Sequence, residues 1–238
     1  RVVAMLSVLA LHSVIPFMQA VPDGLKWAFA QPDPTAWADH LFVVLRSVGT
    51  VMFTLIAGSL FTHLCRRDGP WATLTRRWTR LGASLCAAGL TMLPATYLVW
   101  LWGWTRQGHA NPRSLWYGRW EPGYEETLYG PAQLWYLEYL LIITTLAAIL
   151  WIVFKHVRPF ADGRGGTVRS LIWLAGAGAG AGLIVAQWPD TVNAFRNTPV
   201  PMVGRLTLHT WMFLVGMVAS GSGELRRATA LWPAALAA

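Results

Sequence analysis

An arginine and a histidine, Arg1 and His12, bound the apolar stretch RVVAMLSVLALH, in which Ser7 is the only other polar residue. Because an α-helix turns about 100° per residue, eleven steps bring both side chains to one face, about 16 Å apart along the axis. A histidine there can act as a general base on a hydroxyl group, or it can be a structural residue that hydrogen-bonds to a neighbouring helix. Pro16 cannot donate to the carbonyl of His12, which predicts a kink beside the histidine.

Two further charged residues lie within apolar segments. Arg46 is five residues into a segment that begins at 41, and Glu138 is four residues into one that begins at 134. Both should therefore lie about 6–8 Å below the outer membrane surface. A charge at the membrane centre costs roughly 2.5–3.5 kcal/mol on insertion scales, so both are functional candidates. We expect Arg46 and Glu138 to face each other as an ion pair; the alternative is that Arg46 extends its side chain to the surface.

A third candidate group is the segment 66–80, RRDGPWATLTRRWTR. Arg77 and Arg80 are three residues apart and share one face if the segment is helical, with Arg76 beside them. Arginine side chains bind phosphate oxygens in a bidentate manner. The alternative is an ordinary basic loop on the cytoplasmic side of a membrane protein, which explains the arginines without a ligand.

The elements that position these residues are predicted to be membrane-spanning helices. Apolar residues make up 55% of the 238 residues and charged residues 13%, against roughly 25% charged in a typical soluble domain. The apolar residues fall into six runs of about the length that spans a bilayer: 2–20, 41–65, 81–103, 134–154, 170–188 and 206–220. We predict an all-α polytopic bundle of six helices and a single domain over 1–238, with the start of a seventh helix at 231–238, as in a trimmed piece of a longer protein.

The net charge of +8 follows membrane topology and does not indicate a nucleic-acid-binding protein. If Arg1 is cytoplasmic and the helices alternate, twelve Lys and Arg residues are inside and six outside, with Arg46 within a helix. That asymmetry is typical of a membrane protein with its basic loops inside. The two cysteines, Cys65 and Cys86, have no zinc-ligand spacing, and we predict neither a metal site nor a bound cofactor.

Two other segments have both a structural and a functional interpretation. The run AGAGAGAG at 175–182 gives glycines four residues apart, which favours close helix packing or room for an acyl chain. The predicted outer loop 104–133 combines aromatic and charged residues, which is typical of an interfacial belt and also of a sugar-binding surface.

These motifs, in this order, resemble the acyltransferase 3 family of bacterial membrane acyltransferases, in particular its glucan-modifying branch (glucan biosynthesis protein C-like). The family has an R-x10-H first helix, matched by Arg1 and His12. A small-residue element and an arginine-rich inner loop follow, matched by FTLIAGSLF and by Arg77-Trp-Thr-Arg80. QLWYLEYLL from Gln133 and HTWMFLVGM near the end resemble two later family motifs. Members usually have about ten helices, more than the six expected here.

The resemblance implies transfer of an acyl group from acyl-coenzyme A to a hydroxyl of an extracytoplasmic glycan or lipid, in the bacterial inner membrane. It implies that His12 is the catalytic base or acyl relay, that Arg1 is its partner, and that Arg77 and Arg80, with Arg76, contact the phosphates of the donor. From depth and charge we add Glu138 and Arg46; the donor to a developing oxyanion would be Arg46 or a backbone amide. Two alternatives stay open: a proton-coupled or lipid transporter, and a non-catalytic membrane assembly subunit.

Overall fold

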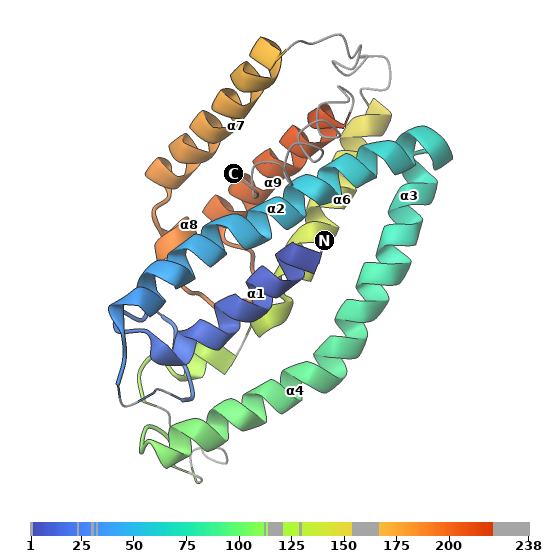
Figure 1. The fold of residues 1–238 in the computed structure, drawn as a ribbon. Coiled ribbons are helices and arrows are strands. Elements are labelled where there is room, and N and C mark those ends of the chain that lie inside the picture. The colour runs from blue at the N-terminus through green and yellow to red at the C-terminus, as the bar shows by residue number, and fades with distance from the viewer. Residues whose placement is uncertain are drawn as a thin grey trace.

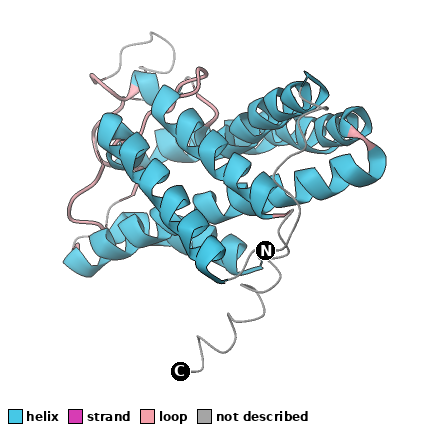
Figure 2. Cartoon of the chain, turned by 90° about the horizontal axis from the view of Figure 1, so that it is seen from above, coloured by secondary structure: helices cyan, strands magenta, loops and turns pink. Residues whose placement is uncertain are grey.

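The structure is a computed structural model that describes residues 2–22, 24–29, 31, 33–111, 113, 121–128, 130–153 and 167–220. All regular elements in these ranges are helices (Figure 2). In chain order they are α1 (Val2–Val14), η1 (Ile15–Phe17), α2 (Ala36–Asp68), α3 (Pro70–Arg77), η2 (Trp78–Gly82), α4 (Ala83–Arg106), η3 (Glu125–Leu128), η4 (Ala132–Leu134), α6 (Trp135–Val153), α7 (Thr167–Gln187), α8 (Asp190–Asn193) and α9 (Val203–Ala219).

The six predicted apolar runs all contain helices, which confirms the all-α membrane bundle. Three helical stretches in the described part are long and apolar enough to cross a membrane: Ala36–Asp68, Pro70–Arg106 and Ala132–Val153. Shorter apolar helices cover Leu6–Phe17, Ala175–Gln187 and Val203–Ala219. The predicted start of a seventh helix at 231–238 lies outside the described residues.

The centre of the bundle is formed by α2, α6 and α9, which run in the same direction (Figure 1). Their main apolar cluster joins Phe61 of α2, Ile143 of α6 and Phe213 of α9. A side chain at Gly58 would meet the carbonyl oxygen of Phe213 at 2.0 Å, so the backbones of α2 and α9 are in direct contact there. The small-residue element AGS in α2 therefore serves close packing, as small residues do between membrane helices.

Helix α1 packs antiparallel on α2 and ends earlier than the sequence predicts. Pro16 lies in the 3₁₀ turn η1, which continues from α1 as one helical stretch to Phe17, so the hydrogen-bond pattern changes at the proline and the histidine lies in the last turn of α1. A proline tolerates the first turn of a new helix, because its missing N–H has no partner there. Gly49 of α2 faces Ser7 and Val8, so His12 is level with residues 44–45 of α2, within one turn of Arg46.

Helices α3, η2 and α4 form one continuous arm of 37 residues, which bows away from the bundle in Figure 1. At one end the arm is held by Trp78, whose indole Nε1 donates to Thr145 of α6 at 3.0 Å. At the other end, Trp100 and Trp104 pack against the 18–35 segment and η4. Between these ends the apolar side chains are exposed, with Leu90 at 80%. The middle of the arm is therefore a surface suited to lipid.

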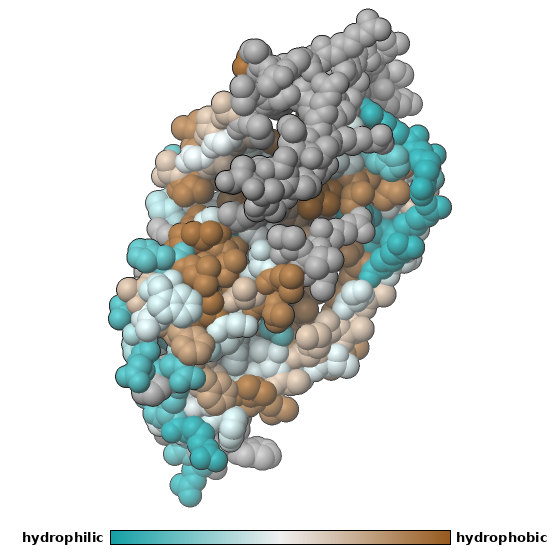
Figure 3. All heavy atoms as spheres, viewed as in Figure 1, coloured by the Kyte–Doolittle hydropathy of each residue, from teal (hydrophilic) through white to brown (hydrophobic). Residues whose placement is uncertain are grey.

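The segments predicted to form the outer loops meet at one end of the bundle. The buried side chain of Asn197 donates to the carbonyl of Thr127 at 2.5 Å and to the Tyr97 hydroxyl at 3.3 Å, and accepts from the amide of Ala132 at 2.6 Å. The Trp104 indole Nε1 donates to the carbonyl of Lys26 at 3.2 Å. In Figure 3 hydrophobic residues gather between this end and the hydrophilic edge formed by α3. These contacts join the segments before α2, after α4 and before α9 at one end of the bundle, as helices that alternate in direction require.

The glycine-rich helix α7 packs on α9 at one of its four predicted glycines. A side chain at Gly180 would meet the indole of Trp211 at 2.5 Å, and the Trp211 Nε1 donates to the carbonyl of Ala177 at 3.0 Å. Side chains at Gly176, Gly178 and Gly182 would meet nothing within 4 Å in the described part of the chain. The packing interpretation therefore holds for Gly180.

Candidate active site

Three polar side chains lie at one level in the middle of the bundle, one from each central helix. The Thr54 hydroxyl of α2 is 2.9 Å from Nδ1 of His209 in α9 and 3.2 Å from the hydroxyl of Tyr136 in α6. Thr54 also donates to the carbonyl of Thr50 one turn earlier, at 2.8 Å. His209 is 3% exposed and is surrounded by the rings of Trp135, Tyr136 and Tyr139. A buried imidazole with a hydroxyl partner can hold or pass a proton.

On the outer side of this level, two arginines meet at one oxygen atom. A terminal nitrogen of Arg46 donates to the carbonyl of Ala194 at 2.8 Å, and a terminal nitrogen of Arg205 donates to the same carbonyl. The Arg205 Nε also donates to the carbonyl of Thr191 at 3.4 Å. Arg205 is 6% exposed and its guanidinium lies over the ring of Trp135, 5.5 Å from the ring centre. This is a concentration of positive charge inside the bundle.

The predicted ion pair between Arg46 and Glu138 is wrong. Neither residue takes part in an ion pair with a described residue. Helix α2 begins at Ala36, so Arg46 is ten residues into it, whereas Glu138 is three residues into α6. Tyr136 of α6 is level with Thr54 of α2, so Glu138 is level with about residue 56, which is ten residues or about 15 Å along α2 from Arg46. The sequence predicted that α2 starts at residue 41, and the five additional residues account for about half of this separation.

On the inner side, Arg77 extends from the end of α3 into the bundle. One of its terminal nitrogens donates to the carbonyl of Ala57 at 3.3 Å. Ala57 is three residues beyond Thr54 on α2, which is about 4.5 Å along the helix axis. Arg77 therefore approaches the Thr54 level from the cytoplasmic side of the predicted topology.

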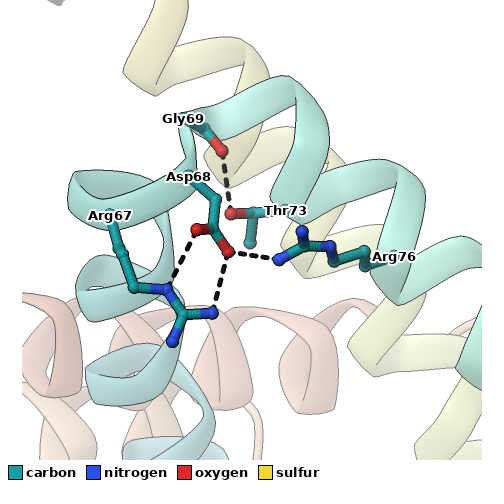
Figure 4. Close-up of polar contacts among 5 residues, drawn as sticks. All are labelled: Arg67, Asp68, Gly69, Thr73 and Arg76. Carbon is teal, nitrogen blue, oxygen red and sulfur yellow. Dashed lines mark hydrogen bonds and ion pairs between the residues drawn. The ribbon is translucent and has the colours of Figure 1, made fainter.

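The other two predicted phosphate-binding arginines do not join Arg77. The Asp68 carboxylate accepts both Nε and a terminal nitrogen of Arg67, each at 2.9 Å, and also a nitrogen of Arg76 (Figure 4). The Thr73 hydroxyl bonds to the carbonyl of Gly69 at 2.8 Å and closes the same turn. Arg76 is thus already partnered by an acidic residue at the α2–α3 hairpin.

Arg80 is exposed, whereas Arg77 is half-buried and reaches the carbonyl of Ala57, so the two arginines have different surroundings. The reason is local: Trp78–Gly82 form a π-helical turn, whose hydrogen bonds run from i to i+5 and add one residue to the turn. Three residues therefore advance the chain by less of a turn than in an α-helix. The expectation of a common face assumed α-helical geometry throughout.

The three levels form a polar column along α2, from Arg46 and Arg205 through Thr54, Tyr136 and His209 to Arg77. The distance from the Arg46 level to the Ala57 level is eleven residues, or about 16 Å. His12 has an exposed side chain at the outer half of this column, by its register with α2. Arg1 lies outside the described residues, so its relation to His12 stays a prediction.

Sequence reasoning missed His209 and Arg205 as candidate site residues. Arg205 directly precedes the predicted apolar run 206–220, which places it among the six basic residues outside, and His209 stands only as the first residue of the motif HTWMFLVGM. The signal available in the sequence was their spacing, because residues four apart on an apolar helix lie on the same face. Both face the bundle interior.

The described residues contain no group of three or more His, Cys, Asp or Glu side chains that could hold a metal ion. One hollow of about 330 Å³ lies between α6, α7 and α9 and is lined mainly by apolar residues, among them Leu146, Ile184 and Trp211. None of the column residues lines it. This hollow is therefore separate from the column residues.

Comparison with known proteins gives one match. No curated protein and no solved structure matches the chain. The family model described as an acyltransferase domain matches residues 1–238, the whole of the sequence. With its helices arranged as a membrane bundle and its polar column inside, the chain belongs to the acyltransferase 3 family and is a membrane protein that transfers acyl groups.

Proposed function

We propose that the protein moves an acyl group from a cytoplasmic acyl-coenzyme A to a hydroxyl of an envelope glycan or lipid at the outer side of the bacterial inner membrane. The observation that supports this most is the polar column, because its two ends differ in the way such a reaction requires. Arg77 approaches the column from the side of the arginine-rich segment, and Arg46 lies at the end where the outer loops meet.

In this proposal the donor enters from the inner side and its phosphates contact Arg77. Guanidinium groups bind phosphate oxygens strongly through charge-assisted hydrogen bonds. Arg80 is exposed near the same turn and is available to a large headgroup at the membrane surface. Arg76 contributes only if it leaves Asp68, since its described contact is with that carboxylate. Acyl-coenzyme A is a co-substrate here, and no bound cofactor is needed.

His12 is the proposed general base, and it acts from the outer half of the bundle. The acceptor hydroxyl loses its proton to the imidazole as its oxygen bonds to the thioester carbon, and the C–S bond then breaks. The coenzyme A thiolate leaves and takes up the proton from the imidazolium. Arg46 is within one turn of the His12 level and is suited to stabilise the oxyanion that forms in between. Arg1 would favour the imidazolium only at long range, since about 16 Å separate them on the helix.

The test is acyl transfer by a His12→Ala variant in cells that express the protein at the wild-type level. Envelope glycans and lipids are analysed by mass spectrometry, and initial rates are measured in membranes with labelled acyl-coenzyme A. A positioned base contributes about 10²–10⁴-fold, so we expect a loss of at least about 100-fold. His63→Ala is the matched control, because His63 is an exposed histidine on α2. Activity of His12→Ala within about threefold of the control would refute the assignment of the base.

A further inference from the structure

Arg46 and Arg205 bring two positive charges to one carbonyl oxygen without a described acidic partner. The four ion pairs in the described ranges involve Asp68, Glu121 and Asp190, and none includes either arginine. A buried charge without a counter-charge is strongly unfavourable, and two like charges at one atom add to that cost. A carbonyl dipole offsets only part of it. The pair therefore has the electrostatics of a site that is completed by an anion.

The position of Arg205 strengthens this conclusion. It is the third residue of α9, in the first turn, where the helix dipole is positive and disfavours a cation. Its side chain is held inward by the carbonyls of Thr191 and Ala194, at the end of α8. An arginine kept in such a place by the fold increases the local positive potential, and an anion bound there relieves it.

Most N–H donors of the two arginines have no acceptor among the described residues. Two guanidinium groups carry ten N–H donors, and three of these donate to described residues. Thr191, whose carbonyl accepts from Arg205, also has a buried hydroxyl with no partner in the described part of the protein; this hydroxyl lies against Gly204, the residue before Arg205 in α9. A carboxylate or phosphate group offers the acceptor oxygens that these donors lack, and arginine pairs bind such groups in a bidentate manner.

We propose that Arg46 and Arg205, with the hydroxyl of Thr191, bind a carboxylate or phosphate group of the acceptor, so that the acceptor is an anionic molecule. That the bound molecule is the acceptor of the acyl group rests on the proposed function. The site is at the outer end of the column, about 12 Å along α2 from Thr54, whereas the proposed donor contact at Arg77 is on the inner side. A molecule held at this end reaches the column from outside.

The experiment measures binding and not activity. The purified chain in a neutral maltoside detergent is heated with glucose, glucuronate or glucose 6-phosphate, each at matched ionic strength, and thermal unfolding is followed. For a ligand present at tenfold its Kd we expect an increase in Tm of about 3–6 °C with an anionic sugar and none with glucose. A shift with glucuronate alone identifies a carboxylate site, and a shift with glucose 6-phosphate alone identifies a phosphate site.

Arg46→Gln and Arg205→Gln should each abolish the shift. The matched control is Arg196→Gln, which removes an arginine from the same segment, one that is exposed and pairs with Asp190 at 3.3 Å; its shift should equal that of the wild type. If Arg205→Gln does not fold, Arg46→Gln decides alone. No stabilisation of the wild type by either anion, or an undiminished shift in Arg46→Gln, overturns the proposal. Binding without acyl transfer would overturn the proposed function and leave the anion site standing.

Discussion

The two ends of the bundle hold their arginines in opposite ways. At the inner end, Arg67 and Arg76 are exposed and share the carboxylate of Asp68 at the surface. At the outer end, Arg205 is buried, shares a carbonyl oxygen with Arg46, and has no described acidic partner. The inner segment has more arginines, but the outer pair has the less satisfied ones. Unsatisfied charge in the interior indicates a binding site better than the number of charges does, because exposed pairs contribute only about 0–1 kcal/mol.

The two ends also differ in what holds them together. The outer end depends on the buried Asn197, whose side chain connects Tyr97 of α4 with Thr127 and Ala132. The inner hairpin depends on the half-buried carboxylate of Asp68, which pairs with two exposed arginines, and on a threonine hydroxyl. A buried amide leaves its partners without hydrogen bonds when it is removed, whereas exposed arginines that lose a carboxylate can bond to water. The outer end should therefore be the more sensitive of the two to single substitutions.

The largest effect on stability is expected for Asn197→Leu. The substitution keeps the side-chain size but leaves the amide of Ala132 and the carbonyl of Thr127 unpaired in a buried place. Each unsatisfied group costs about 1–3 kcal/mol, which predicts a decrease in Tm of about 5–15 °C. Thermal unfolding in detergent measures it, with Thr198→Val as the exposed neighbouring control. A change no larger than that of the control would show that the outer end is held by other contacts.

The next largest effect is expected for Arg77→Gln. If Arg77 binds the donor phosphates, kcat/KM for acyl-coenzyme A should fall by about 10–100-fold, in line with the roughly 1.5–3 kcal/mol of a charged hydrogen bond. Initial rates against donor concentration measure this. Arg80→Gln is the matched variant and should lose less, because Arg80 is exposed and Arg77 reaches Ala57 inside the bundle. Equal losses would mean that the π turn does not separate their roles.

The smallest effect is expected for Asp68→Asn. The carboxylate is shared by two exposed arginines, so its loss should lower Tm by about 4 °C at most. The difference between wild type and variant should shrink further at high salt, because salt screens surface charges. A Tm decrease as large as that of Asn197→Leu would erase the distinction between the two ends.

The sequence predicted the fold class well because long apolar runs are sufficient to predict membrane helices. It predicted the site less well, for reasons that concern single residues. At Pro16 the chain changes from an α-helix to a 3₁₀ turn, which the sequence cannot distinguish from a continuing α-helix with a bend. Arg46 was placed too near the surface because polar residues before residue 41 hid the first turns of α2.

The contacts at the centre of the site could not be predicted because they join distant parts of the chain. Thr54 and His209 are 155 residues apart, and Arg46 reaches the carbonyl of Ala194 across 148 residues. Nothing in either local sequence identifies the partner. The family motifs gave the order of the helices along the sequence. The structure shows that α2 packs against α9, which brings Thr54 next to His209.

The π turn at Trp78–Gly82 has a consequence for how relatives of this chain are aligned. The turn contains one residue more than an α-helical turn would need. A homologue that lacks one residue of this turn after Arg80 would continue as an unbroken α-helix, with its two arginines about 60° apart around the axis. An alignment that moves the gap into the neighbouring hairpin would pair each arginine with the residue next to its counterpart. The gap belongs inside the helix, where a single inserted residue changes the phase of everything that follows.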